Sequence, residues 1–92
     1  MYNWQLSTAV KLAEENFLAG IQIAFDRKTS RPYYIQFTTR CGAVARLVTA
    51  HTKKEKRKTR EFSTKGAAMR FLNTRFPGHD SLLCDDVKVI NY

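Results

Sequence analysis

Two short stretches of alternating side chains decide the fold, Ile21-Gln22-Ile23-Ala24-Phe25 and Tyr33-Tyr34-Ile35-Gln36-Phe37. In each stretch large apolar residues recur at every second position, which places them on one face of a β-strand. The residues between the stretches, 26–32, are rich in turn formers, so the two strands should form a hairpin. After a turn at Gly42, residues 43–49 predict a third strand with Arg46 on the face opposite Ala45 and Leu47. The three strands would form an antiparallel meander.

Two segments with helical periodicity flank this meander. The first runs from Trp4 to Phe17, with Asn3 as its N-cap, because its apolar residues recur at intervals of three and four. The second helix should begin after Ser63 as N-cap and end before Pro77 and Gly78. The apolar stripes of the two helices are Leu6, Val10, Ala13 and Phe17, and Ala67, Ala68, Phe71, Leu72 and Phe76.

These elements predict an α+β fold. Residues 60–62 are extended, and residues 82–90 alternate as a last strand that should pair with the same sheet. We expect a two-layer sandwich, with a mainly antiparallel sheet (the three-strand meander plus the C-terminal strand) and two helices on one face. Residues 1–92 should form a single domain, because so short a chain cannot supply two separate cores. The predicted core is Phe17, Ile23, Phe25, Ile35, Phe37, Phe71 and Leu72.

Positive charge is concentrated in the middle of the chain. Sixteen Lys and Arg residues against eight Asp and Glu residues give a net charge of +8. Within residues 27–75 only Glu55 and Glu61 oppose the basic side chains. A field of this strength on a small protein favours polyanionic partners, foremost nucleic acid.

The sharpest feature is the run at 51–60, which holds six cations and no apolar residue. Such a run cannot enter a core, so it predicts a solvated basic loop, with 52–58 as a hairpin tip or a disordered loop. It has two interpretations: the loop binds a phosphate backbone and releases counterions, or it only improves solubility. The candidate nucleic-acid contacts are Lys53, Lys54, Lys56, Arg57, Lys58 and Arg60, with Arg40 and Arg46 extending the patch onto the sheet.

An aromatic pair adds a candidate stacking residue. Tyr33 and Tyr34 are adjacent on a strand and must face opposite ways, so only one can join the core beneath the helices. We expect the other, assigned here as Tyr34, to be exposed among Arg31, Arg40 and Arg46, where it could stack on an unpaired base. Cross-strand packing is the alternative role for this tyrosine.

Other chemistry is weakly indicated, and we predict no enzyme activity, metal or cofactor. The potential zinc ligands Cys41, His51, His79 and Cys84 lack the paired short spacings of zinc sites. A Cys–His nucleophile built from the same residues has no orienting partner. The carboxylates Asp80, Asp85 and Asp86 could hold a divalent cation, but the favoured interpretation is a loop cap at Asp80 followed by acidic residues that discourage pairing at a strand end.

Several segments resemble a known group of proteins. Residues 23–27, 30–33 and 60–63, the last leading into the Ala-rich stretch 67–72, are similar to small partition-associated proteins encoded on plasmids and integrative elements. The resemblance implies a bacterial mobile-element accessory protein that acts near DNA without enzymatic activity. A function placed on the Lys-rich insert 52–58 is not implied by this resemblance.

The sequence therefore predicts a cytoplasmic, basic nucleic-acid-binding accessory protein that grips the phosphate backbone with little sequence readout. The cytoplasm is expected because the chain has two cysteines, no basic stretch leading into an apolar run at its start and no apolar run of the roughly 18 residues that span a bilayer. The alternative is a protein-interaction module or inhibitor that docks its basic face on an acidic groove or a nucleic-acid channel of a host complex. No membrane partner is expected, and the oligomeric state is left open, a homodimer included.

Overall fold

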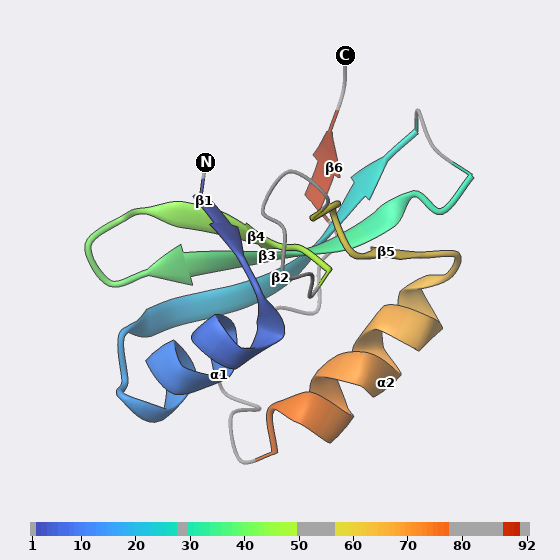
Figure 1. The fold of residues 1–92 in the computed structure, drawn as a ribbon. Coiled ribbons are helices and arrows are strands. Elements are labelled where there is room, and N and C mark those ends of the chain that lie inside the picture. The colour runs from blue at the N-terminus through green and yellow to red at the C-terminus, as the bar shows by residue number, and fades with distance from the viewer. Residues whose placement is uncertain (1, 28–29, 50–56, 78–87, 91–92) are drawn as a thin grey trace.

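The computed structural model describes residues 2–27, 30–49, 57–77 and 88–90 (Figure 1). Two helices and a six-stranded sheet confirm the predicted α+β fold. In chain order the elements are β1 (Tyr2–Trp4), α1 (Leu6–Glu14), β2 (Leu18–Asp26), β3 (Tyr33–Thr39), β4 (Val44–Leu47), β5 (Glu61–Phe62), α2 (Lys65–Arg75) and β6 (Lys88–Ile90).

The sheet is mixed but mostly antiparallel, with the strand order β1-β4-β3-β2-β6 and with β5 also paired to β3. The predicted meander is confirmed, because β3 pairs antiparallel with both β2 and β4. Ile23 lies opposite Ile35 and Ile21 opposite Phe37, as the period-two pattern requires. The C-terminal strand β6 joins the sheet beside β2, in parallel. A second parallel pair, β1 with β4, was not predicted.

The core lies between one face of the sheet and the two helices. Phe37 on β3 is fully buried, and its ring centroid lies 5.7 Å from that of Trp4 and 5.9 Å from that of Phe76. Of the predicted core residues, Ile23, Ile35, Phe37 and Leu72 are buried, whereas Phe25 and Phe71 are half-buried. Both helices contribute to this one cluster, so both pack on the same face of the sheet.

The N-terminal residues form a strand where a helical turn was predicted. Helix α1 begins at Leu6, and Gln5 occupies the N-cap position without a side-chain cap bond. Asn3, predicted as the cap, lies in β1. Tertiary contacts override the helical periodicity here: Trp4 stacks on Phe37, and the Trp4 carbonyl accepts a 2.8 Å hydrogen bond from the Val48 amide.

Phe17 is not a core residue, because α1 ends one turn earlier than predicted. The helix stops at Glu14, and Asn16 adopts a left-handed backbone with φ of 67°. The Asn16 amide donates to the Ala13 carbonyl and the Phe17 amide to the Leu12 carbonyl, which is the Schellman pattern of a helix C-terminus. This turn directs Phe17 outward and leaves it 53% exposed.

The second helix also begins one residue later than predicted. Thr64, and not Ser63, is the N-cap of α2, and its hydroxyl oxygen accepts a 3.1 Å hydrogen bond from the Ala67 amide. The helix ends at Arg75, two residues before Pro77, as the proline predicted.

Candidate nucleic-acid interface

The last residues of the basic run, 58–60, pair with residues 47–49, which continue β4. The Thr49 amide donates to the Lys58 carbonyl at 2.7 Å, and the Lys58 amide donates to the Thr49 hydroxyl at 3.0 Å. Val48 forms an antiparallel bridge to Thr59, and the Arg60 amide donates to the Leu47 carbonyl at 2.9 Å. Residues 58–60, predicted as loop, are therefore one side of a paired stem. We call 47–49 and 58–60 the hairpin stem.

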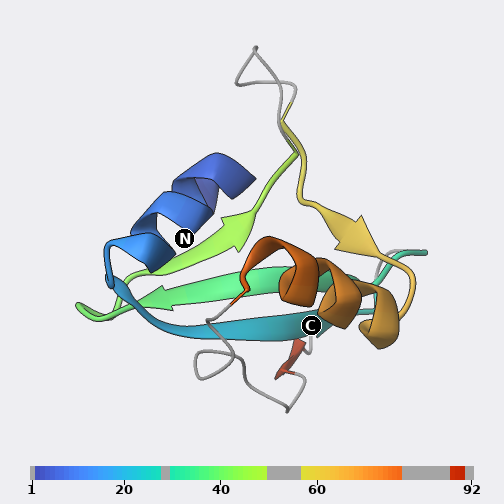
Figure 2. The ribbon, with the colours of Figure 1, turned by 90° about the horizontal axis from the view of Figure 1, so that it is seen from below.

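The sheet topology explains why this stem stands away from the sheet. Strands β4 and β5 pair with the same strand, β3, at successive positions: β4 with Gln36–Thr38 and β5 with Tyr33–Tyr34. On β3 only Ile35 lies between the residues paired with β4 and those paired with β5. The residues that connect β4 to β5 therefore have no room to pair with β3 and must leave the sheet. The stem accordingly rises from the sheet (Figure 2).

Of the six cations predicted in the run, the structure describes three. Arg57 is half-buried, whereas Lys58 and Arg60 are exposed. Lys53, Lys54 and Lys56 lie outside the described residues. The stem thus presents Lys58 and Arg60 to solvent on the strand that returns toward β5.

Arg60 belongs to a cluster of cations and aromatic rings that the sequence did not reveal. Its guanidinium carbon lies 5.4 Å from the Phe62 ring centroid and 5.8 Å from that of Phe71. The two rings are 5.3 Å apart, and Arg75 lies 6.0 Å from Phe71. These distances are within the range of cation–π contacts. Among the described residues no carboxylate pairs with the Arg60 guanidinium.

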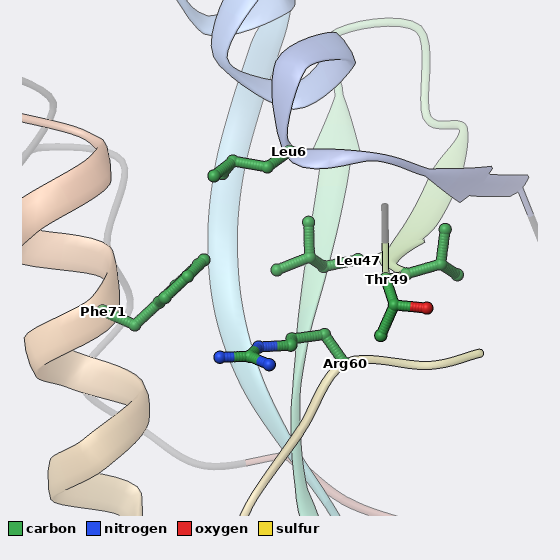
Figure 3. Close-up of a pocket in the computed structure, with 6 residues that line it drawn as sticks. Leu6, Leu47, Thr49, Arg60 and Phe71 are labelled. Atoms are coloured by element: carbon green, nitrogen blue, oxygen red, sulfur yellow. The ribbon is translucent and has the colours of Figure 1, made fainter. Parts of the chain in front are cut away.

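A pocket of about 320 Å³ opens at the base of the stem. Helix α1 provides Leu6 and helix α2 provides Phe71, whereas the stem provides both Thr49 and Arg60 (Figure 3). The Arg60 guanidinium lies beside the Phe71 ring. The full lining is Leu6, Leu47, Val48, Thr49, Arg60 and Phe71, so the wall is apolar apart from one cation and one hydroxyl.

Arg40 and Arg46 do not form one patch with the stem. Arg40 sits in the β3–β4 turn, at the end of β4 remote from the stem, and donates to the Asn16 side-chain oxygen at 3.0 Å. Arg46 is on the face opposite the helices, as predicted, and its Nε donates to the Asn3 side-chain oxygen at 3.1 Å. Leu47, the next residue, faces the pocket, so Arg46 points to the other side of the sheet.

The prediction of an exposed Tyr34 is wrong. Tyr33 packs against the core and Tyr34 faces the other way, as their adjacency required. Tyr34 is nevertheless only 8% exposed, so its ring offers no open surface for a base. The aromatic ring that lies next to a cation and is not fully buried is instead Phe71, beside Arg60.

The turn that carries Arg40 also holds an exposed thiol, Cys41. Gly42 allows the turn, with φ of 91°, and its amide donates to the Thr39 carbonyl at 3.0 Å. A hydrogen bond with the Thr39 hydroxyl at 3.1 Å is the main cause that lowers the pKa of the Cys41 thiol, and the Ala43 backbone adds to it.

The other candidate chemical groups are only partly covered by the structure. Within the described part of the chain, no three His, Cys, Asp or Glu side chains come together as a metal site. His51, His79 and Cys84, like Asp80, Asp85 and Asp86, lie outside that part. Neither α1 nor α2 has the length and apolar character needed to cross a membrane.

No protein-family model, curated protein or solved structure matches this chain. The resemblance to partition-associated proteins therefore stays a prediction from residues 23–27, 30–33, 60–63 and 67–72.

Proposed function

We propose that this protein is a nucleic-acid-binding accessory protein that grips the phosphate backbone through its basic hairpin, with little sequence readout. The observation that carries the proposal is the paired stem, which holds Lys58 and Arg60 exposed; in the sequence they directly follow the Lys-rich residues 53–56. A paired stem supports binding because the backbone that carries Lys58 and Arg60 is ordered before a ligand arrives, which lowers the ordering cost.

The expected contacts are electrostatic. Each phosphate that a Lys or Arg neutralises releases condensed counterions, and this release supplies most non-specific affinity. Contacts to phosphate carry no direct sequence information, so the protein should bind different sequences alike. The surroundings of Arg60 support the same role, because its guanidinium contacts two aromatic rings and, among the described residues, no carboxylate. The proposal assigns binding and no reaction.

The test is the salt dependence of binding. We expect the triple variant Lys53→Gln, Lys54→Gln, Lys56→Gln to weaken binding to all sequences alike and to leave the described stem intact. Each lost phosphate contact should reduce the slope of log affinity against log salt by about 0.7 to 0.9, so three contacts amount to about 2 units. Fluorescence anisotropy with labelled oligonucleotides measures both quantities.

A control variant with the same loss of charge separates local binding from net charge. Lys11, Arg27 and Arg70 are exposed and lie outside the hairpin, so replacing them by Gln should leave the slope nearly unchanged. Equal effects of the two triple variants would contradict a hairpin site. If the protein binds neither DNA nor RNA at about 50 mM salt, where electrostatic binding is strong, the proposal fails and docking on an acidic protein takes its place.

A further inference from the structure

We propose that the pocket at the base of the hairpin stem receives one unpaired nucleobase, so that the protein prefers single strands to duplexes. This inference rests on the proposed function and adds the class of nucleic acid. The juxtaposition that carries it is an apolar pocket whose wall contains four residues of the hairpin stem, Leu47, Val48, Thr49 and Arg60.

The position of the pocket links it to the phosphate-binding cations. Thr49 is bonded to Lys58 across the stem through two hydrogen bonds, so the exposed lysine and the pocket wall are fixed relative to each other. Arg60 follows two residues later on the same strand and lines the pocket itself. A strand whose phosphates lie along the stem would therefore bring a neighbouring base to the pocket mouth.

The chemistry of the wall suits a flat, partly polar ring. Unpaired bases stack on aromatic side chains and on the planes of Arg guanidinium groups, and here Arg60 and Phe71 lie 5.8 Å apart. Leu6, Leu47 and Val48 supply apolar contact for the ring. The guanidinium has five N–H donors, which can serve acceptors on the base edge or an adjoining phosphate.

The size of the pocket favours one ring over a longer ligand. Its volume of about 320 Å³ lies at the lower end of the range for small-molecule pockets, about 300 to 1,000 Å³. A base stacked and paired in a duplex cannot enter the pocket without unstacking and unpairing, whereas turning a base out of a single strand costs little free energy. An apolar side chain of an acidic protein would also fit the volume, but the cations Arg60, in the pocket wall, and Lys58, bonded to the lining residue Thr49, suit a base with a phosphate beside it better.

The test compares a single strand that carries bases with an abasic single strand and with a duplex. The probes are a labelled 12-nucleotide thymidine strand, a strand of the same length built from abasic units, and a duplex of the same length. We expect the abasic strand to bind about 10-fold more weakly than the thymidine strand, in line with base–aromatic stacking. The duplex should also bind more weakly than the thymidine strand.

Two variants test whether the difference in affinity between the thymidine strand and the abasic strand depends on the pocket. Leu6→Trp should fill the pocket, and Phe71→Leu should remove the aromatic face while keeping an apolar side chain. In both, the thymidine strand should fall to the affinity of the abasic strand, and the salt slope should stay as in the parent. Thr8→Trp is the matched control, because Thr8 is exposed on α1 outside the pocket, and it should keep the 10-fold difference.

The outcomes separate this inference from the function on which it rests. If thymidine and abasic strands bind the parent equally, and the hairpin lysine variant weakens both, the base pocket is wrong and the phosphate-binding function stands. If no strand binds, both fail. If the peptide Glu-Leu-Phe-Glu binds the parent and not Leu6→Trp, while the strands are not distinguished, the pocket is a protein-docking site and the inference is overturned.

Discussion

Two phenylalanines that the sequence placed in the same core should differ sharply in their contribution to stability. Phe37 is fully buried between Trp4 and Phe76, whereas Phe17 is 53% exposed after the end of α1. Replacing each by Ala removes the same atoms from two environments. The comparison therefore tests the observed end of α1 without depending on the absolute stability of the protein.

The magnitudes follow from burial. Phe37→Ala loses the transfer free energy of a buried ring and leaves a cavity, which together cost about 3 to 5 kcal/mol. Phe17→Ala leaves no enclosed cavity and loses only part of the roughly 1.5 to 3 kcal/mol that full burial contributes, so we expect about 1 kcal/mol. Domains of this size have about 5 to 14 kcal/mol of total stability, so the first variant should lose a large share of it and the second a small one.

Urea denaturation followed by far-UV circular dichroism measures both variants, with the midpoint and the slope m compared with the parent. Circular dichroism is preferred to fluorescence because Trp4 stacks on Phe37 and its emission would change with the mutation itself. If Phe17→Ala costs as much free energy of unfolding as Phe37→Ala, Phe17 is in the core and α1 extends through it. That result would refute the Schellman end at Asn16.

Two further outcomes test local features. Because Asn16 has φ of 67°, we expect Asn16→Val to lower the free energy of unfolding by about 1 to 2 kcal/mol and Asn16→Gly to leave it nearly unchanged; equal urea midpoints for the two variants would count against a left-handed residue there. Because the Thr39 hydroxyl lowers the pKa of Cys41, Thr39→Val should raise that pKa and reduce the thiolate fraction near neutral pH. Alkylation of the Cys41 peptide, followed by mass spectrometry as a function of pH, should then shift to higher pH. An unchanged pH profile would contradict the Thr39 hydroxyl as the cause.

Sequence patterns predicted the elements whose determinants are local. The meander followed from period-two alternation, and the register of Ile23 with Ile35 confirmed it. The errors arose where distant contacts or a single backbone angle determine where an element begins or ends. Trp4 joins a strand because Phe37, far along the chain, offers a stacking surface, and no local pattern contains that information. Asn16 was the available signal for an early helix end, because Asn tolerates the left-handed region better than most residues.

The candidate site likewise has one feature that the sequence predicts and one that only the tertiary structure shows. The cationic run at 51–60 is visible in the sequence, because a dense row of charges excludes burial whatever the fold. The pocket is not visible, since it requires the register that sets Thr49 against Lys58 and the packing that brings Phe71 from α2 beside Arg60. The same limit explains why the stacking role was predicted for Tyr34. The prediction that Tyr34 faces away from Tyr33 was correct, but the burial of its side chain depends on tertiary structure.

Charge alone cannot separate a nucleic acid from an acidic protein, because both are attracted by the same cations. The geometry around Arg60 adds a second requirement, since a ligand must present a flat or apolar group next to an anion to use both the guanidinium and the Phe71 ring. A single-stranded nucleic acid meets this requirement at every residue, because each phosphate has a base beside it. A protein meets it only where an aromatic or aliphatic side chain adjoins a carboxylate. Base-dependent affinity, and not affinity itself, is therefore the property that distinguishes the two partners.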